Sequence, residues 1–390
     1  MPGGHGNKVP APTCQGRLPR PLGTFAPADR RVGGASVSAR EVVSTMGGSG
    51  PGDGHVTTRG RITRNHSGPS AKTLHAAISL AIQAPSLHNT QPWRWHLDDG
   101  RVHLHADPSR WLPATDPEGR DVTISCGAAL HHFLVALVTL GWRGVVHRLP
   151  DSGRPYHLAT IEPRHSHGSP VIEDVLARAI LKRRTDRRAF SGRPVMPSLV
   201  RWLAEHAEDE GATLSEVGEA QRDALLAALG QAPVSAEFDS GYWTELSTSR
   251  CARAARRDGD RTSPGSPRWT EMSRHRATVR ETAQAAELDP VEPDRSALLV
   301  LGTNQDSRLG WLRTGEALSM VLLAATDVGL ASCPLDRQRE IDRTRLLVRL
   351  LALPGAAFPQ LLVRVGWPRA GSQALPATPR RPLRDVVEGY

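Results

Sequence analysis

The segment CGAALHHFLVALVTLGW, Cys126–Trp142, is apolar on most of its sides, which is typical of a helix buried within a core. A second long apolar segment, Leu309–Leu330, is similar to it. Thr-Gly-Glu-Ala-Leu stands near its start where the first segment has Cys-Gly-Ala-Ala-Leu, and both have a glycine near their ends. This internal similarity is compatible with a chain made of two related halves.

Shorter periodic segments surround the two long ones. Residues 71–83 place Leu74, Ala77 and Ile78 on one stripe of a helix that has to end before Pro85. Residues 93–106 alternate in polarity around Asp98-Asp99-Gly100, a sequence that favours a β-hairpin. The same patterns predict a helix that begins at Ser169-Pro170, helices at 197–211 and 219–230, and strands at 144–150, 155–163, 297–303 and 360–367.

The positive charge of the chain is unevenly distributed. The 390 residues carry a net charge of +9, but residues 1–70 hold nine Lys or Arg against three Asp or Glu, so +3 remains for residues 71–390. Residues 1–70 are rich in Gly, Pro and Ser and lack periodicity, which predicts a disordered basic leader with a candidate true start at Met46. A nearly neutral folded part argues against a nucleic-acid-binding protein.

Neither metal binding nor membrane insertion is indicated. The cysteines form no Cys-x-x-Cys motif and suit a reducing cytosol: Cys14, Cys126, Cys251 and Cys333. His103 and His105 alternate on a strand, as do His165 and His167, but no third ligand stands at a suitable spacing, so we assign no metal site. The chain has no run of about 18 apolar residues and no apolar signal stretch, which predicts a cytoplasmic protein that does not bind a membrane.

The linker between the first helix and the hairpin, Pro85–Trp93 (PSLHNTQPW), is unusual in composition. Two prolines stiffen it, and Ser86, Asn89 and Gln91 supply groups that donate and accept hydrogen bonds to the edge of a flat ligand. An ordinary turn is the alternative, with amides that cap their own backbone and with Trp93 and Trp95 in the core.

Arginines gather in two other places. RRTDRRAF, Arg183–Phe190, surrounds a hydroxyl with four guanidinium groups, which can hold a phosphate through forked hydrogen bonds. The alternative is a solvated basic helix end. Arg380-Arg381 could complete such a clamp or could simply be exposed near the terminus.

Together these segments resemble the FMN-dependent nitroreductase family, and most of all its Acg-type branch, in which one chain carries two nitroreductase-like halves. The stretch Ala-Pro-Ser-x-His-Asn-Thr-Gln-Pro-Trp of that branch is intact, and Leu181–Phe190 resembles the family segment Arg-x-Ser/Thr-x-Arg/Lys. Residues 315–335 resemble the helix and Gly-Leu turn beside the flavin, and TPRRPL (378–383) resembles the C-terminal phosphate-side segment. The resemblance covers residues 71–390.

The resemblance implies an α+β fold, a sandwich of helices around mainly antiparallel sheets in which two pseudo-repeated halves mimic a homodimer. We expect the first half at 71–168 and the second at 169–390, with a lid near the polar residues 250–290.

The resemblance also implies one FMN site built from both halves. The linker Pro85–Trp93, which we call the amide loop, would face the ring and the ribityl chain. The segment Arg183–Phe190, which we call the arginine block, would hold the phosphate together with the C-terminal arginines. The turn after the second long helix would lie near the ring. The implied cofactor-binding residues are Pro85, Ser86, Asn89, Gln91, Arg183, Arg184, Thr185, Arg187, Cys333, Pro334, Leu335, Arg380 and Arg381.

Two functions follow from this resemblance. The first is an FMN-dependent oxidoreductase that passes hydride from NAD(P)H to a nitroaromatic or quinone-type acceptor, with no side chain needed as nucleophile or general acid, so that we name no catalytic residue. The second is an FMN storage or sequestration protein of the stress response with little turnover. In both, we expect a monomer that acts as a pseudo-dimer and binds one FMN per chain.

Overall fold

The computed structural model describes residues 68–166, 171–222, 224–225, 293–335, 348–349, 353 and 357–388. Nearly all of the expected leader 1–70, the helix start at Ser169-Pro170, half of the helix expected at 219–230 and the expected lid at 250–290 lie outside these residues.

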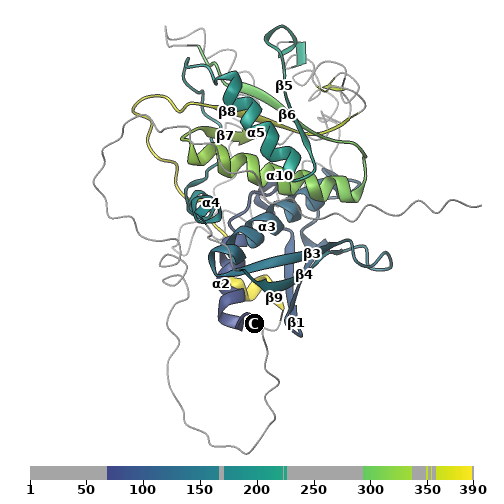
Figure 1. The fold of residues 1–390 in the computed structure, drawn as a ribbon. Helices are drawn as coiled ribbons and strands as arrows, with labels where there is room; N and C mark the ends of the chain where they lie inside the picture. The colour runs from purple at the N-terminus through teal and green to yellow at the C-terminus, as the bar shows by residue number, and fades with distance from the viewer. Residues whose placement is uncertain are drawn as a thin grey trace, which may run out of the picture. The chain divides into compact units, whose positions relative to one another are not determined.

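Two sheets and five main helices make up the described part (Figure 1). The first sheet has the order β3-β4-β2-β1-β9, with β1 Trp93–Asp98, β2 Arg101–Ala106, β3 Trp142–Arg148, β4 His157–His165 and β9 Val387–Glu388. The second has the order β5-β6-β8-β7, with β5 Thr213–Glu216, β6 Ala297–Thr303, β7 Ala331–Pro334 and β8 Phe358–Gly366. The helices are α2 Ala71–Ala81, α3 Arg120–Thr139, α4 Val171–Lys182, α5 Pro197–Asp209 and α10 Arg308–Asp327.

The same succession of elements occurs twice. The chain runs α2-β1-β2-α3-β3-β4 and later α5-β5-β6-α10-β7-β8, and matching strands have the same neighbours in the two sheets. Both long helices have 20 residues, and each is followed by a glycine in the left-handed region, Gly141 at φ 87° and Gly329 at φ 86°. The expected α+β fold with mainly antiparallel sheets and two related halves is confirmed.

The helix predicted from Cys126 in fact begins at Arg120. The reason is a polar first turn that carries no apolar periodicity. Gly119 precedes the helix in the left-handed conformation, and the Asp116 carboxylate accepts a hydrogen bond of 3.0 Å from the backbone N–H of Val122. Such a cap stabilises the helix start without any apolar residue. Although α3 is long and apolar enough to cross a membrane, it is largely buried inside the protein, as a core helix is.

The two long helices touch at their glycines. A Cβ atom on Gly127 would overlap the carbonyl oxygen of Leu312, and one on Gly315 would overlap the carbonyl oxygen of Ile124. The contact is reciprocal, as at the two-fold axis of a homodimer, because Ile124 and Gly127 meet the matching Leu312 and Gly315. Figure 1 shows α3 and α10 lying between the two sheets.

One turn further along, the matching residues His131 and Ser319, 188 positions apart, share a hydrogen bond of 2.7 Å between Nδ1 and Oγ. The short internal similarity in the sequence therefore marks the surface on which the two halves meet.

The C-terminal segment crosses from the second half to the first. Strand β9 pairs in parallel with β1, and the N–H of Trp95 donates to the carbonyl of Val386 at 2.7 Å. Trp93 and Trp95 are fully buried on the inner face of β1, as expected, and Trp95 packs on Phe133 of α3 with ring centroids 5.0 Å apart. The tail thus ends inside the sheet that carries the amide loop.

Histidines form a cluster on the outer face of the first sheet. His105 of β2 stacks on His157 of β4 with centroids 4.5 Å apart, and His103 Nδ1 lies 3.3 Å from His157 Nε2. His103 and His105 are partly buried and His157 is buried, so that these strand histidines pack on one another. Among the residues that the structure describes, no group of three or more His, Cys, Asp or Glu could hold a metal ion.

We expect Gly127→Ala or Gly315→Ala to destabilise the fold. A methyl group at either position collides with the backbone of the other helix, and overpacking of this kind costs about 1–3 kcal/mol or more. Urea unfolding measures the loss. Gly68→Ala is the matched control, because no atom lies within 4 Å of its added Cβ; equal stability of all three variants would contradict the close crossing.

We expect stability to fall as the pH drops through the range set by His105. Burial, followed by the charges of His157, His103 and His96, lowers the pKa of His105 from 6.5 to about 4. The unfolded chain therefore takes up a proton at a higher pH than the folded chain does, and stability is lost between pH 6.5 and about 4. Thermal unfolding across this range should show a shallower loss for His105→Gln, and identical profiles would contradict the prediction.

Candidate functional site

The amide loop between α2 and β1 has a strained backbone. His88, Asn89 and Gln91 have positive φ values of 46°, 56° and 52°, which residues other than glycine rarely adopt. Hydrogen bonds stabilise the loop: Gln91 N–H donates to Ser86 Oγ at 3.0 Å, and Leu87 N–H donates to Ser125 Oγ on α3 at 3.2 Å. Strain maintained by the surrounding structure is frequent at ligand-binding sites.

The two amides of the loop hold the C-terminal segment. Asn89 Nδ2 donates to the carbonyl of Pro379 at 3.2 Å, and Gln91 Oε1 accepts from the backbone N–H of Arg381 at 2.8 Å. Arg380 Nη1 also donates to Asn89 Oδ1 at 3.3 Å. The amides therefore fix Arg380 and Arg381, more than 280 residues away in the sequence, against the loop.

The arginine block reaches the same place from the second half. Helix α4 ends at Lys182, and Thr185 forms a bridge parallel to Ser332 of β7. The N–H of Asp186 donates to the carbonyl of Ser332 at 2.9 Å. This pairing places Thr185 and Arg187 beside Pro334, the last residue of β7.

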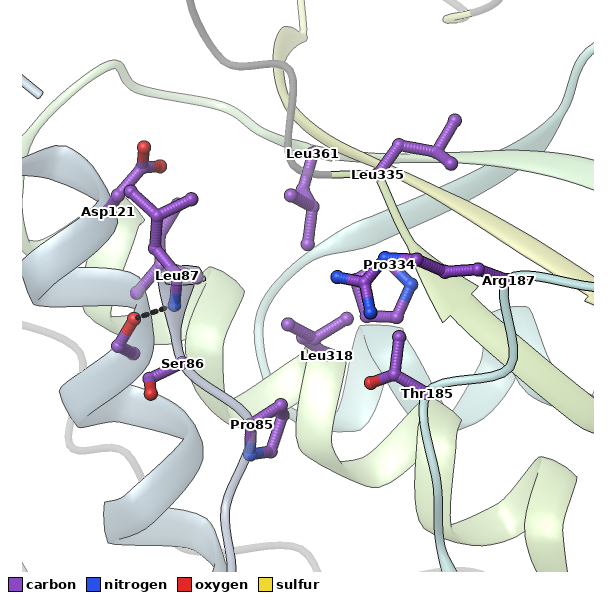
Figure 2. A pocket seen from close by; sticks show the side chains of 12 residues that line it. Pro85, Ser86, Leu87, Asp121, Thr185, Arg187, Leu318, Pro334, Leu335 and Leu361 are labelled. Atoms are coloured by element: carbon purple, nitrogen blue, oxygen red, sulfur yellow. Dashed lines mark hydrogen bonds between the residues drawn. The ribbon is translucent and has the colours of Figure 1, made fainter. Parts of the chain in front are cut away.

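A pocket that is partly open to solvent, which we call the cavity, lies between the loop and the block, with about 530 Å³ of free space when the solvent-open part is included. Figure 2 shows Pro85 and Thr185 on one side of it, Asp121 and Leu361 away from them, and the Arg187 guanidinium beside Pro334. Residues of both halves line it: Pro85, Ser86, Leu87, Asp121, Ile124, Ser125, Thr185, Arg187, Leu318, Pro334, Leu335 and Leu361.

Three arginines next to this cavity form a cation cluster: Arg183, Arg184 and Arg380. Arg183 Nη1 lies 3.5 Å from Thr185 Oγ1, and Arg380 Nη2 donates to the carbonyls of Gln83 and Ala84, the residues just before Pro85. Within the described part of the chain, none of the three has a carboxylate within 4.0 Å, and the Nε atom of each is buried without a hydrogen-bond partner.

Burial and the neighbouring positive charges both lower the pKa of arginines in this cluster. Burial lowers the pKa of Arg183 to about 9, with further contributions from Arg380 and Arg184, and lowers the pKa of Arg380 to about 10, with a contribution from Arg184. The guanidinium groups therefore remain charged at neutral pH while they repel one another. A buried charge without a partner is costly, so the cluster favours a bound anion.

Other arginines nearby are already neutralised. Arg188 Nη2 lies 2.7 Å from Asp186 Oδ2, and Arg381 Nη1 lies 3.6 Å from Asp107 Oδ2. Arg381 also donates to the carbonyls of Gln91 and Asp385. Of the two C-terminal arginines, Arg380 belongs to the cation cluster, whereas Arg381 anchors the backbone.

The structure thus brings most of the expected site residues together. Six of them line the cavity: Pro85, Ser86, Thr185, Arg187, Pro334 and Leu335. Arg183 bonds to the lining residue Thr185, Arg184 bonds to the carbonyl of Arg183, and Arg380 bonds to Ala84 next to Pro85. Asn89, Gln91 and Arg381 are not among the lining residues. Cys333 is buried in β7, with its thiol 3.6 Å from the carbonyl of Pro334, and does not line the cavity.

Several lining residues were missed in the sequence. Asp121, Ile124 and Ser125 belong to the first turns of α3, which the apolar pattern did not include, and Leu318 and Leu361 look like ordinary core residues. The polar cap at Asp116 was the one signal that could have extended the helix to them.

These residues fit the chemistry of FMN. The orphaned Nε atoms of the cation cluster are donors suited to a phosphate, and the apolar walls of Leu87, Leu318 and Leu361 suit a planar ring. Thr185 connects the cation cluster to the apolar cavity, because it lines the cavity and its hydroxyl lies 3.5 Å from Arg183 Nη1.

We expect Gln91→Ala to loosen the C-terminal segment. The substitution removes the acceptor of the Arg381 N–H, so that β9 should detach from β1 more readily. Limited proteolysis with trypsin, followed by mass spectrometry, should show faster cleavage after Arg380 or Arg384. Gln83→Ala is the control, because its amide bonds only within its own helix turn; equal cleavage rates in both variants would contradict the anchoring role.

Comparisons with known proteins agree with this geometry, although no family model matches the chain. Two proteins of Mycobacterium tuberculosis carry the name "Putative NAD(P)H nitroreductase". One is 40% identical over 339 residues, covering 85% of this chain and 96% of the relative. The other, acg, is 36% identical over 323 residues, covering 80% and 94%.

Among solved structures, the FMN-dependent nitroreductase NfnB of Mycobacterium smegmatis in complex with NADPH is 19% identical and covers 55% of this chain and 97% of its own, with a TM-score of 0.35. The full-length sequence relatives carry the conclusion: the chain belongs to the FMN-dependent nitroreductase family, in its Acg-type branch.

Proposed function

We propose that this protein is an FMN-binding NAD(P)H oxidoreductase of the nitroreductase type. The observation that carries the proposal is the cation cluster next to a cavity shared by the two halves, in which Arg183 is buried and Arg184 and Arg380 are half-buried. Within the described part of the chain these guanidinium groups bond to uncharged oxygens but to no carboxylate, so that a bound anion would offset their mutual repulsion.

In this proposal the cation cluster holds the phosphate, and Thr185 adds a hydroxyl. Pro85, Ser86 and Leu87 face one part of the ring, while Pro334, Leu335 and Arg187 face another. Asn89 and Gln91 act indirectly, since they hold Arg380 in place.

Bound FMN supplies two-electron transfer between a reduced nicotinamide and an organic acceptor such as a nitroaromatic or a quinone. The chain's own residues orient it, exclude water on the leucine-lined side and place the Arg187 guanidinium by the cavity. No lining residue is assigned as a general acid, because orientation and charge stabilisation suffice for hydride transfer.

A second candidate function is storage or sequestration of FMN in the stress response with little turnover. The same cation cluster supports it, because tight phosphate binding does not require access for a nicotinamide. In either case we place the protein in the cytoplasm as a monomer, since α3 and α10 already form within one chain the contact that a second subunit would provide.

We expect Arg183→Ala to weaken FMN binding strongly. Each charged hydrogen bond contributes about 1.5–3 kcal/mol, so loss of one guanidinium should raise the Kd by roughly 10- to 150-fold. Arg188→Ala is the matched control, because Asp186 already neutralises Arg188. Fluorescence titration with FMN checks both, and equal Kd values would show that the phosphate lies elsewhere.

Rapid mixing of the FMN-loaded protein with NADPH separates the two candidate functions. Prompt loss of the flavin absorbance band is the result expected for the oxidoreductase. An unchanged spectrum on the same timescale, with FMN still bound, would favour storage and overturn the proposed turnover.

A further inference from the structure

The internal repeat relates the cavity to a second place in the molecule. Ser125 and Ile124 of α3 line the cavity, and their counterparts 188 residues later are Arg313 and Leu312 of α10. At the cavity, the loop after α2 contacts Ser125. At the second place, the turn after α5 contacts Arg313, whose side chain lies 3.7 Å from a Cβ built on Gly211. We call this the repeat-related place.

The connection at the repeat-related place is much shorter. Residues 82–92 join α2 to β1, whereas 210–212 alone join α5 to β5. The three-residue turn has no counterpart of the amide loop. Glu210 stands at its start, and its carboxylate lies 3.8 Å from Nε2 of His131 on α3.

Charged side chains, of which Glu316 is the buried one, occupy this place instead. Glu316 of α10 is fully buried and accepts two hydrogen bonds from Arg148 of β3, at 2.9 Å from Nε and 2.7 Å from Nη2. Arg313 Nη1 lies 3.5 Å from the same carboxylate. Burial raises the pKa of Glu316 and of Glu210, while the charges of Arg148 and Arg313 oppose the rise in both.

The two places differ in charge balance. The network of Arg148, Glu210, Arg313 and Glu316 contains two cations and two carboxylates: both arginines lie within 4.0 Å of Glu316, and their charges also act on Glu210. The numbers of positive and negative groups are therefore equal without a ligand. Among the described residues, the cation cluster beside the cavity has no carboxylate, so it favours a bound anion. Matching residues underline the difference: Glu316 stands where α3 has Ala128, and Arg313 where α3 has Ser125.

We propose that this network occupies the position of a second ring-binding cavity, and that it closes a cryptic site for a planar aromatic molecule. The inference rests on the proposed FMN site, because the internal repeat defines the repeat-related place as the counterpart of that site. Removal of one arginine and Glu316 together keeps the numbers of positive and negative groups equal and frees the volume of two long side chains.

The test counts flavin on the variant Arg148→Ala/Glu316→Ala by equilibrium dialysis. Protein saturated with FMN is dialysed against lumiflavin, which has the ring but no phosphate and so does not require the cation cluster. The expected result is one lumiflavin per chain beyond the FMN in the variant and none in the wild type. No extra lumiflavin on a folded, FMN-binding variant would overturn the proposal.

Further variants keep the result decisive. Arg313→Ser/Glu316→Ala installs the residues of the matching α3 positions and should also bind lumiflavin. Glu162→Ala/Arg164→Ala removes a pair on β4, 2.9 Å apart, far less buried than Glu316, and should bind none. If neither Arg148→Ala/Glu316→Ala nor Arg313→Ser/Glu316→Ala folds, the network is required for folding and does not merely occupy a binding site, and the proposal is wrong. Failure of the wild type to bind FMN would instead refute the proposed function.

Discussion

The structure depends on the close crossing of α3 and α10 at Gly127 and Gly315. Side chains larger than hydrogen at these positions would force the helices apart. The C-terminal segment adds a second connection between the halves, through β9 and the amide loop. The bond between His131 and Ser319 continues the pairing along the helices. Because the cavity lies where the first turns of α3 approach Leu318 of α10, its width is set by the same crossing.

The balance of positive and negative side chains distinguishes the proposed FMN site from the repeat-related place. Close packing leaves little room for water to screen buried charges, so each buried group requires a partner. Arg148 and Glu316 satisfy one another, and Arg188 and Arg381 have carboxylates of their own. Among the described residues, Arg183 and its neighbours in the cation cluster have none, and this imbalance distinguishes them from these paired arginines.

The amide loop shows how a local motif acquires a role at long range. Its sequence suggested groups aimed directly at a ligand. In the structure Asn89 and Gln91 bind the backbone of Pro379 and Arg381, and so hold Arg380 near Arg183. The positive φ values of the loop are maintained because the tail, through β9, is locked into the sheet next to β1.

The sequence by itself determined the elements whose signal is local. Apolar periodicity predicted α2, the two long helices and most strands, the Asp99-Gly100 turn predicted the hairpin, and the motifs identified the family. Only the tertiary structure decided the start of α3 at Arg120, the division of labour between Arg380 and Arg381, and the filling of the repeat-related place. These features depend on contacts between charged and capping groups up to about 290 residues apart in the sequence. The local periodicity of the sequence contains no information about such contacts.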